Sequence, residues 1–332
     1  MVADSLHRPL QDLRLSVTDR CNFRCTYCMP KEIFGRDHAF LPKADILSFE
    51  ELARVARLFA RLGVNKVRVT GGEPLLRRDL PRLIEMLAAI DGITDLTLTT
   101  NGSALAALAK PLRQAGLQRL TVSLDSLDEA TFRSMNDVDF PVSRVLEGID
   151  AAVAEGFSPV KVNMVVKRGV NEHEVVSILK HFSGTGVVVR FIEFMDVGST
   201  NGWRLDDVVS AAEMLRLIAR EFEVAPVAQD LTGLVARRYQ YPGGEFGIIA
   251  SVTQPFCQGC TRARVAADGQ FYTCLFASTG HDLRALLRSG LDDEALLMAI
   301  REIWKARNDR YSEIRSAETT AMPKAEMSKI GG

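Results

Sequence analysis

The chain has 332 residues, of which 47% are hydrophobic and 25% are charged, a composition typical of globular proteins. Lys and Arg number 41 against 42 Asp and Glu, so no overall field attracts nucleic acid or anionic lipid. No apolar run is long enough to span a bilayer, and residues 1–11 lack the features of a secretory signal. We therefore expect a cytoplasmic protein that binds neither nucleic acid nor membrane, and in which any anionic ligand needs a local group of basic residues.

A repeating strand–helix pattern runs from Leu13 to about Phe194. It predicts strands at Leu13–Val17, Lys66–Thr70, Asp95–Thr100, Arg119–Leu124, Val160–Val166 and Val187–Phe194. It predicts helices at Phe49–Leu62, Leu80–Ala89, Ser103–Ala115, Val142–Glu155 and Glu172–Phe182. Strands separated by helices of this length pair in parallel with right-handed crossovers. Six such units predict an α/β fold, an incomplete (β/α)6 barrel of the TIM type, with functional residues where strands end and loops begin.

The pattern changes after Phe194. The remaining sequence predicts a helix at Leu205–Phe222, strands near Arg237–Tyr241, Gly247–Val252 and Phe271–Phe276, and helices near His281–Ser289 and Asp293–Ala306. These elements indicate a small C-terminal α+β unit that closes the open side of the barrel. We therefore expect a partial barrel over residues 1–200, a C-terminal domain over 201–307, and a flexible polar tail over 308–332.

Six cysteines fall into two triplets, Cys21, Cys25 and Cys28, and Cys257, Cys260 and Cys274. Thiolates are soft ligands that suit zinc and iron–sulfur clusters, and a structural zinc needs four ligands. A cubane cluster held by three cysteines keeps one iron open. Each triplet thus predicts a [4Fe-4S] cluster with an open iron. Two alternatives remain, namely disulfides, since the count is even, and zinc sites completed by His38 or His281.

The first triplet directly follows the first predicted strand, with the spacing C-x3-C-x2-C and Tyr27 before Cys28. This motif resembles the signature of the radical S-adenosylmethionine (SAM) superfamily. The resemblance implies that SAM binds the open iron and is cleaved to a 5′-deoxyadenosyl radical, which abstracts hydrogen from the substrate. From spacing alone, Tyr27 could equally be a core residue.

Further residues agree with this resemblance. Thr70-Gly71-Gly72-Glu73-Pro74 ends the second strand and resembles the superfamily's Gly-Gly-Glu-Pro element. Ser123 and Asp125 end the fourth strand, and Met195 follows the sixth. The resemblance implies a SAM site formed by Tyr27, Gly72, Glu73, Ser123 and Met195. By themselves these residues also fit a turn without a ligand and ordinary core packing.

The second triplet stands beside Arg262 and Arg264, in the stretch Phe256-Cys257-Gln258-Gly259-Cys260-Thr261-Arg262-Ala263-Arg264. This stretch resembles the GTP 3′,8-cyclase family, lyase-type enzymes of the first step of molybdenum-cofactor biosynthesis. The resemblance implies conversion of GTP to (8S)-3′,8-cyclo-7,8-dihydroguanosine 5′-triphosphate through abstraction of the ribose C3′ hydrogen. It also implies that guanine binds the open iron of the second cluster. A rival of the same class is a two-cluster radical SAM enzyme acting on a peptide or another small molecule.

Basic residues recur on the predicted strands, at Arg14, Arg68, Lys161 and Arg190, and Thr99 lies near the end of the third strand. Charges that point into a barrel need an anionic partner, and a triphosphate supplies one. The resemblance implies that GTP is bound by Arg14, Arg68, Thr99, Lys161, Arg262 and Arg264, and the strand position adds Arg190.

The chain ends in Gly331-Gly332. The family resemblance implies that this tail reaches into the active site and assists the radical step, so both glycines are assigned a catalytic role. A frayed terminus is the plain alternative. The implied partners are GTP as substrate, an external electron donor and a downstream pterin-forming enzyme, and a homodimer is left open as the assembly.

Overall fold

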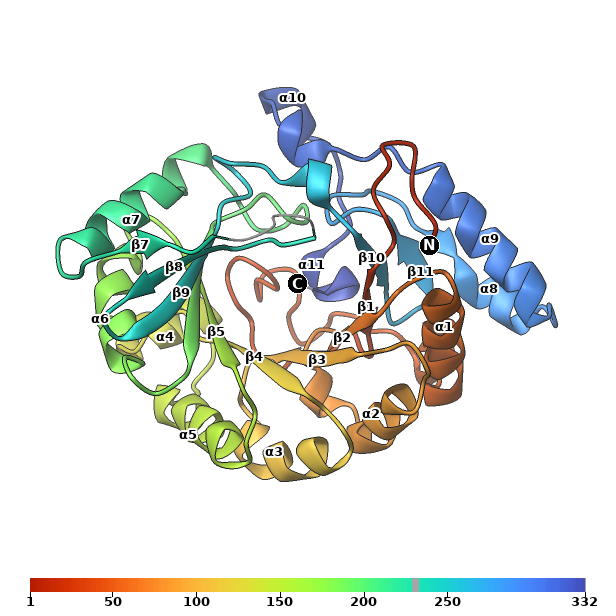
Figure 1. Cartoon of the computed structure of the whole chain (residues 1–332), viewed down its shortest axis with the longest axis horizontal. Helices are drawn as coiled ribbons and strands as arrows, with labels where there is room; N and C mark the ends of the chain where they lie inside the picture. The colour runs from red at the N-terminus through yellow and green to blue at the C-terminus, as the bar shows by residue number, and fades with distance from the viewer. Residues whose placement is uncertain (229–232, 332) are drawn as a thin grey trace.

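The computed structural model describes residues 1–228 and 233–331, and its strands form one sheet in the order β12-β11-β10-β1-β2-β3-β4-β5-β6-β9-β8-β7. The middle of this sheet consists of β1 Asp12–Ser16, β2 Lys66–Thr70, β3 Asp95–Thr100, β4 Arg119–Ser123, β5 Val160–Val166 and β6 Val188–Glu193. These strands pair in parallel and in chain order. The sheet curves around a central space with helices outside it (Figure 1). The predicted α/β partial barrel is thus confirmed.

The predicted C-terminal α+β unit is present, and its strands are divided between the two edges of the barrel sheet. β9 Gly244–Ile249 pairs in parallel with β6, and β10 Arg262–Val265 pairs in parallel with β1. Antiparallel strands continue each edge, namely β8 Arg237–Tyr241 and β7 Ala225–Pro226 beyond β9, and β11 Gln270–Tyr272 and β12 His281–Asp282 beyond β10. The second cysteine triplet is thereby joined directly to the first strand of the barrel.

Helices cover the outside of the sheet. Those of the barrel are α1 Phe49–Arg61, α2 Leu80–Ala88, α3 Leu105–Gln114, α4 Glu129–Asn136, α5 Val142–Ala154 and α6 Val175–His181. The C-terminal part adds α7 Ala211–Ala219, α8 Leu283–Arg288, α9 Asp293–Lys305, α10 Ala317–Thr320 and α11 Met327–Ile330. Short 3-10 helices occur at Lys43–Asp45, Pro74–Leu76, Glu172–Glu174, Leu205–Asp207, Cys257–Gly259 and Tyr311–Glu313. None of the described helices combines the length and apolar character needed to cross a membrane.

The two faces of each barrel strand differ because side chains alternate across a strand. In β1, Leu13 and Leu15 are fully buried against the outer helices, whereas Arg14 faces the interior of the barrel. The register places Arg14 beside Arg68 of β2 on one side and beside Arg264 of β10 on the other. The hydrophobic core therefore lies between sheet and helices, and the interior of the barrel is lined by polar and charged side chains.

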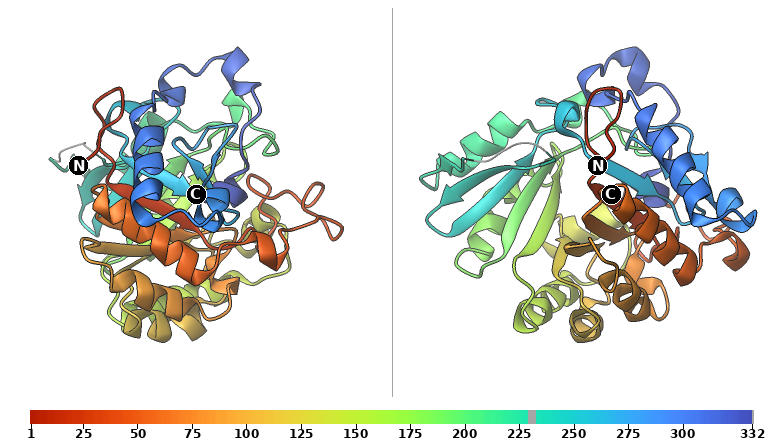
Figure 2. Two further views of the ribbon diagram at one scale, coloured as in Figure 1. Left: turned by 90° about the vertical axis from the view of Figure 1, so that its right-hand side faces the viewer. Right: turned by 45° about the vertical axis from the view of Figure 1, so that its right-hand side comes forward.

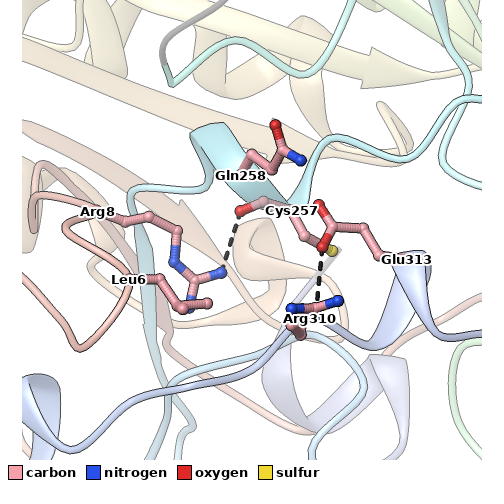
Figure 3. A pocket seen from close by; sticks show the side chains of 6 residues that line it. All are labelled: Leu6, Arg8, Cys257, Gln258, Arg310 and Glu313. Atoms are coloured by element: carbon pink, nitrogen blue, oxygen red, sulfur yellow. Dashed lines mark hydrogen bonds and ion pairs between the residues drawn. The ribbon is translucent and has the colours of Figure 1, made fainter.

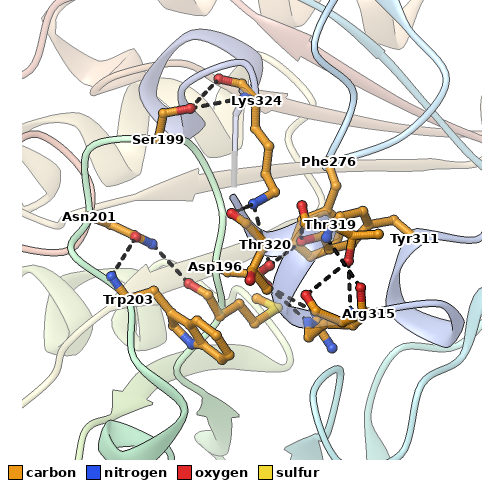
Figure 4. A network of polar contacts seen from close by, with 12 residues as sticks. Asp196, Ser199, Asn201, Trp203, Phe276, Tyr311, Arg315, Thr319, Thr320 and Lys324 are labelled. Atoms are coloured by element: carbon orange, nitrogen blue, oxygen red, sulfur yellow. Dashed lines mark hydrogen bonds and ion pairs between the residues drawn. The ribbon is translucent and has the colours of Figure 1, made fainter. Parts of the chain in front are cut away.

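Residues 308–331 pass over the open side of the barrel, and α11 ends near its centre (Figures 1 and 2). Asp196, in the loop after β6, holds this segment (Figure 4). Its carboxylate accepts hydrogen bonds from Arg315, at 3.1 Å, and from the hydroxyl of Tyr311, and it pairs with Lys324 at 3.4 Å. No finding tests whether the tail is mobile, and in this structure these contacts hold it against the loop after β6.

Candidate active site

A cavity of about 820 Å³ occupies the interior of the barrel. Its lining brings together residues that the sequence assigned to three different sites, namely Arg14, Arg68, Thr99, Lys161, Arg190, Arg262 and Arg264 for GTP, Tyr27, Ser123 and Met195 for SAM, and Cys257, Cys260 and Cys274 for the second cluster. Residues from β1 to β6, β9 and β10 therefore face one shared space.

The first cysteine triplet lies on the loop that follows β1. The carbonyl oxygen of Cys25 accepts hydrogen bonds from the amides of Cys28 and Met29, both at 2.9 Å, which closes a tight turn between two of the ligands. The guanidinium of Arg24 donates to the carbonyl oxygens of Cys21 and Phe23 at 2.8 Å. Burial raises the pKa of Cys21 to about 11 and that of Cys28 to about 12. Thiolates in such surroundings need a bound metal as partner, so this site fits an iron–sulfur cluster.

Gly72 packs directly against the backbone of this cysteine loop. Its amide donates to the carbonyl oxygen of Thr18 at 2.8 Å, and the next amide, that of Glu73, donates to the carbonyl oxygen of Arg20 at 2.8 Å. A Cβ atom on Gly72 would overlap the Arg20 carbonyl oxygen. Glycine is thus required here for packing, whereas the contact of Gly72 with SAM stays a prediction.

Glu73 ties the end of β2 to the loop after β3. Its buried carboxylate accepts hydrogen bonds from the amides of Leu75, at 3.0 Å, and Asn101, at 2.6 Å, and from the hydroxyl of Thr100 at 2.7 Å. Burial raises the pKa of Glu73 to about 7. The side-chain amide of Asn101 in turn lies 3.8 Å from the sulfur of Cys21. Glu73 therefore positions a neighbour of the first triplet.

Tyr27 lines the cavity and is held by Asp125. The tyrosine hydroxyl donates to Asp125 Oδ2 at 2.6 Å, and the amide of Val165 donates to Asp125 Oδ1 at 2.8 Å. Burial raises the pKa of Asp125 to about 6. Ser123 also faces the cavity, and the carbonyl oxygen of Met195 accepts from Asn201 at 2.9 Å. The tyrosine is thus at the cavity wall, where a planar ligand can reach its ring.

The cationic residues of the interior are braced by neutral polar groups. Arg68 donates to the hydroxyls of Thr99, at 2.9 Å, and Thr121, at 3.2 Å. Arg190 donates to Asn163 Oδ1 at 2.9 Å. Thr99, predicted as a GTP contact, therefore also orients Arg68.

Burial and repulsion between neighbouring cations both lower the pKa values of these side chains. Burial, followed by repulsion from neighbouring arginines, lowers the pKa of Arg14 and Arg68 to about 9 each and that of Lys161 to about 7. The pKa of Arg190 is lowered to about 10, again first by burial. A ligand carrying several negative charges would relieve this repulsion, so the cavity favours a polyanion.

A second layer of charges, which was not predicted from the sequence, lies next to this one along the strands. Lys66 pairs with Asp12 at 3.0 Å, and Arg119 donates to Asp95 at 2.9 Å, all four facing the cavity. Each precedes another inward-facing residue by two positions, so strand alternation could have identified them. Because these charges pair with one another, the unpaired positive charge is concentrated in the layer of Arg14 and Arg68.

The second cysteine triplet begins in a 3-10 turn, where the amide of Cys260 donates to the carbonyl oxygen of Cys257 at 3.1 Å. Two guanidinium groups approach the sulfur of Cys260, those of Arg262 at 3.2 Å and Arg307 at 3.1 Å. Burial by itself raises the pKa of Cys260, but these two arginines outweigh it and lower the pKa to about 6. Arg307 lies 47 residues from Cys260 in the chain, and no sequence motif indicated it.

The end of the tail lies inside the site. The carbonyl oxygen of Gly331 accepts a hydrogen bond from Arg264, and Gly331 has a positive φ of 74°. A Cβ atom on Gly331 would overlap the methyl carbon of Thr70. Glycine is thus needed twice here, for its conformation and for its close approach to β2. Gly332 lies outside the described residues.

All six cysteines are free thiols, which contradicts the disulfide alternative. His38, considered as a zinc ligand, packs its ring against Phe34 and Phe40 at 4.7 Å from each. Within residues 1–228 and 233–331, no three His, Cys, Asp or Glu side chains are grouped around one metal position. The thiolates of a cubane cluster each bind a different iron and need not meet at one point.

Comparison with known proteins first defines the class. The Radical SAM superfamily model matches residues 15–182, and the Molybdenum Cofactor Synthesis C model matches residues 187–313. The solved structure of Streptococcus suis SuiB bound to S-adenosylmethionine has a TM-score of 0.62 and 16% identity, covering 89% of this chain and 68% of that chain. This likeness supports the fold, and the family model identifies a radical SAM enzyme.

Similarity over the full length is more specific. The chain is 52% identical to the GTP 3′,8-cyclase of Acidothermus cellulolyticus and 50% identical to that of Staphylococcus epidermidis, in both cases over 100% of this chain and 99% of the relative. The chain belongs to the GTP 3′,8-cyclase family.

Proposed function

We propose that this chain converts GTP to (8S)-3′,8-cyclo-7,8-dihydroguanosine 5′-triphosphate, the first step of molybdenum-cofactor biosynthesis. Family membership supports this activity. The structural observation that carries it is one cavity lined by the cations expected for GTP, by Tyr27, Ser123 and Met195 of the residues expected for SAM, and by the second cysteine triplet.

The residues present fit two [4Fe-4S] clusters and SAM. Cys21, Cys25 and Cys28 would hold the first cluster, and Cys257, Cys260 and Cys274 would hold the second. Two guanidinium groups already stabilise the thiolate of Cys260. When bound, the first cluster and SAM supply the 5′-deoxyadenosyl radical that removes the C3′ hydrogen of GTP.

The side chains that line the cavity would bind and orient GTP. Arg14, Arg68 and Lys161 would neutralise the triphosphate, and Arg262 and Arg264 would orient GTP toward the second triplet, since arginine forks match phosphate oxygens. Such positioning matters because a primary radical reacts with whichever C–H bond lies nearest to it.

Two further parts of the chain would complete the site. Tyr27, fixed by Asp125, would support SAM, for which Gly72, Glu73, Ser123 and Met195 remain the other proposed contacts. The tail, with Gly331 inside the barrel, would exclude water and place the terminal diglycine beside the substrate.

The same proposal covers the compartment, the partners and the assembly of the enzyme. Six free thiols suit a reducing compartment, so we place the enzyme in the cytoplasm. An external donor would supply electrons, and a pterin-forming enzyme would consume the cyclised nucleotide. A homodimer remains a proposal for the assembly.

The test is anaerobic incubation of the reconstituted protein with SAM, dithionite and GTP, followed by liquid chromatography and mass spectrometry. We expect 5′-deoxyadenosine and the 3′,8-cyclised nucleotide in equal amounts. Formation of 5′-deoxyadenosine without any GTP-derived product would refute the cyclase and favour a two-cluster enzyme with another substrate.

A further inference from the structure

Three arginines from distant parts of the chain contact Cys257 or Cys260 of the second cysteine triplet. Arg8 belongs to the N-terminal segment, Arg262 to β10, and Arg307 follows α9. Besides approaching the sulfur of Cys260, Arg307 donates to the carbonyl oxygen of the same residue at 2.9 Å. Arg8 donates to the carbonyl oxygen of Cys257 at 3.0 Å. We call Arg8, Arg262 and Arg307 the arginine shell.

The arginine shell is fixed in place by a buried carboxylate. Asp4 Oδ2 lies 2.6 Å from Arg8 Nε and 3.1 Å from Arg307 Nη1, and the three side chains are exposed by 0%, 2% and 1% respectively. The guanidinium of Arg307 also lies over the ring of Trp304, 4.6 Å from its centroid. Asp309 Oδ2 lies 3.5 Å from Arg307 Nε, so two carboxylates, those of Asp4 and Asp309, face three guanidinium groups and the shell keeps a net positive charge. The donors are therefore oriented before any cofactor binds.

Three donor atoms of the shell, Arg8 Nη2, Arg262 Nη1 and Arg307 Nε, are buried without a hydrogen-bond partner among the described residues. Arg307 Nε forms a longer ion pair with Asp309 Oδ2 at 3.5 Å, which leaves Arg8 Nη2 and Arg262 Nη1 with neither kind of contact. Arg8 faces both the main cavity and a smaller cavity of about 250 Å³ that also reaches Cys257 (Figure 3). A buried guanidinium nitrogen without an acceptor is costly. The sulfur atoms of a cluster held by this triplet are acceptors of the required kind.

The first triplet is bonded differently. Its sulfur at Cys21 is approached by neutral donors, the amide of Phe23 at 3.4 Å and the side-chain amide of Asn101 at 3.8 Å. The nearby Arg24 directs its guanidinium to backbone carbonyl oxygens instead, those of Cys21, Phe23 and Phe34. Within the described residues, charged donors to cysteine sulfur thus occur at the second triplet and not at the first.

We infer that the arginine shell holds the second cluster at a higher reduction potential than the first. This inference rests on the proposed function, because it assumes the cluster that the second triplet would hold. Reduction adds one negative charge to a cluster, and hydrogen bonds from cationic donors to its sulfur atoms stabilise the reduced form. The second cluster is then the first of the two to accept an electron. Arg8 and Arg307 act through the cysteines and are positioning residues.

The test is a redox titration followed by electron paramagnetic resonance on reconstituted full-length protein. A variant with Cys21, Cys25 and Cys28 all changed to Ala isolates the signal of the second cluster, and comparison with the unaltered protein gives the first. In Arg307→Gln we expect the ratio of reduced to oxidised second cluster at fixed potential to fall at least tenfold, which is about 59 mV for a one-electron couple. Arg301→Gln, an exposed position on α9, is the matched control and should leave the ratio unchanged.

A second variant, Arg307→Lys, keeps the inference testable if the glutamine variant loses its cluster. Lysine keeps the positive charge but cannot contact both the sulfur and the carbonyl oxygen of Cys260 as Arg307 does. It should lower the ratio less than glutamine does. The inference is overturned if the lysine and glutamine variants retain their iron and the second cluster has the same reduction potential as in the unaltered protein. It is also overturned if the first cluster is reduced before the second. A protein that shows the predicted order of potentials but forms no cyclised nucleotide would refute the proposed function alone.

Discussion

Replacement of Asp196 by Asn should release the C-terminal tail from the barrel. Asp196 is 3% exposed, and its carboxylate is shared by Tyr311, Arg315 and Lys324, all of them in the tail (Figure 4). The side chains of Arg315 and Lys324 are themselves 9% and 2% exposed. The asparagine variant keeps the shape of the side chain but leaves two buried cations without a counter-charge.

The size of the effect follows from those exposures. Removing one partner of a buried ion pair costs about 3–5 kcal/mol. Because these contacts join the tail to the loop after β6, the cost is relieved by local opening of residues 308–331 while the barrel stays folded. A cost of about 3 kcal/mol raises the population of the open tail roughly 100-fold.

Hydrogen exchange measured by mass spectrometry on the ligand-free protein reads this population directly. Peptides covering residues 311–331 should exchange faster in Asp196→Asn, and peptides from β1 to β6 should not change. Asp206→Asn is the control, since Asp206 is an acidic residue near the same loop whose side chain is 88% exposed. Unchanged exchange of the tail in a folded Asp196→Asn protein would show that the network does not hold the tail.

Three further predictions concern the tail end, the second triplet and the cations. In Gly331→Ala the new Cβ atom would overlap Thr70, so the end of the tail should leave the barrel. The yield of cyclised nucleotide should then fall at least tenfold while the iron content stays unchanged. Cys257→Ala should lose about half of the bound iron and all cyclisation but retain SAM cleavage, and loss of SAM binding would contradict separate roles for the two triplets. The pKa of Lys161 is about 7 in the fold against an ordinary 10.5, so the unfolded chain binds more protons between these values. The free energy of unfolding of the ligand-free protein should therefore rise with pH over that window and rise less in Lys161→Met, as measured by urea denaturation.

Much of the barrel could be predicted because its signals are local. The predicted second, third and fifth strands have the observed bounds, since in each of them apolar residues alternate with polar or inward-facing ones and turn residues stand near both ends. The sequence Ser48-Phe49-Glu50-Glu51 has the pattern of a capping box and marks the start of α1, where Ser48 Oγ accepts from the amide of Glu51 at 3.1 Å. Helix α4 was missed because its eight residues are only two turns, too short for a clear helical period.

The arrangement around the second triplet could not be predicted in the same way. Asp4 and Arg307 are 303 residues apart, and their contact follows from the packing of the N-terminal segment beside α9. Asp196 and the tail are likewise joined across more than 100 residues. Such pairs leave no periodic pattern in the sequence, because each contact depends on how the complete chain folds. The cysteine motifs predicted the two cluster sites, and the sequence placed Arg262 beside the second, but Arg8 and Arg307 became visible only in the fold.

Those charges also determine how two ligands can lie in the cavity. Near the first triplet the ionisable groups include the carboxylates of Glu73 and Asp125, and beside the second triplet they include the guanidinium groups of Arg262 and Arg264. SAM carries a sulfonium cation and GTP a triphosphate, so electrostatic attraction favours SAM at the first end and the nucleotide phosphates toward the arginines. The reverse arrangement would bring each ligand against like charge in a site of low dielectric constant. The polarity of the cavity thus reinforces the division of roles between the two triplets, independently of the metal that each triplet binds.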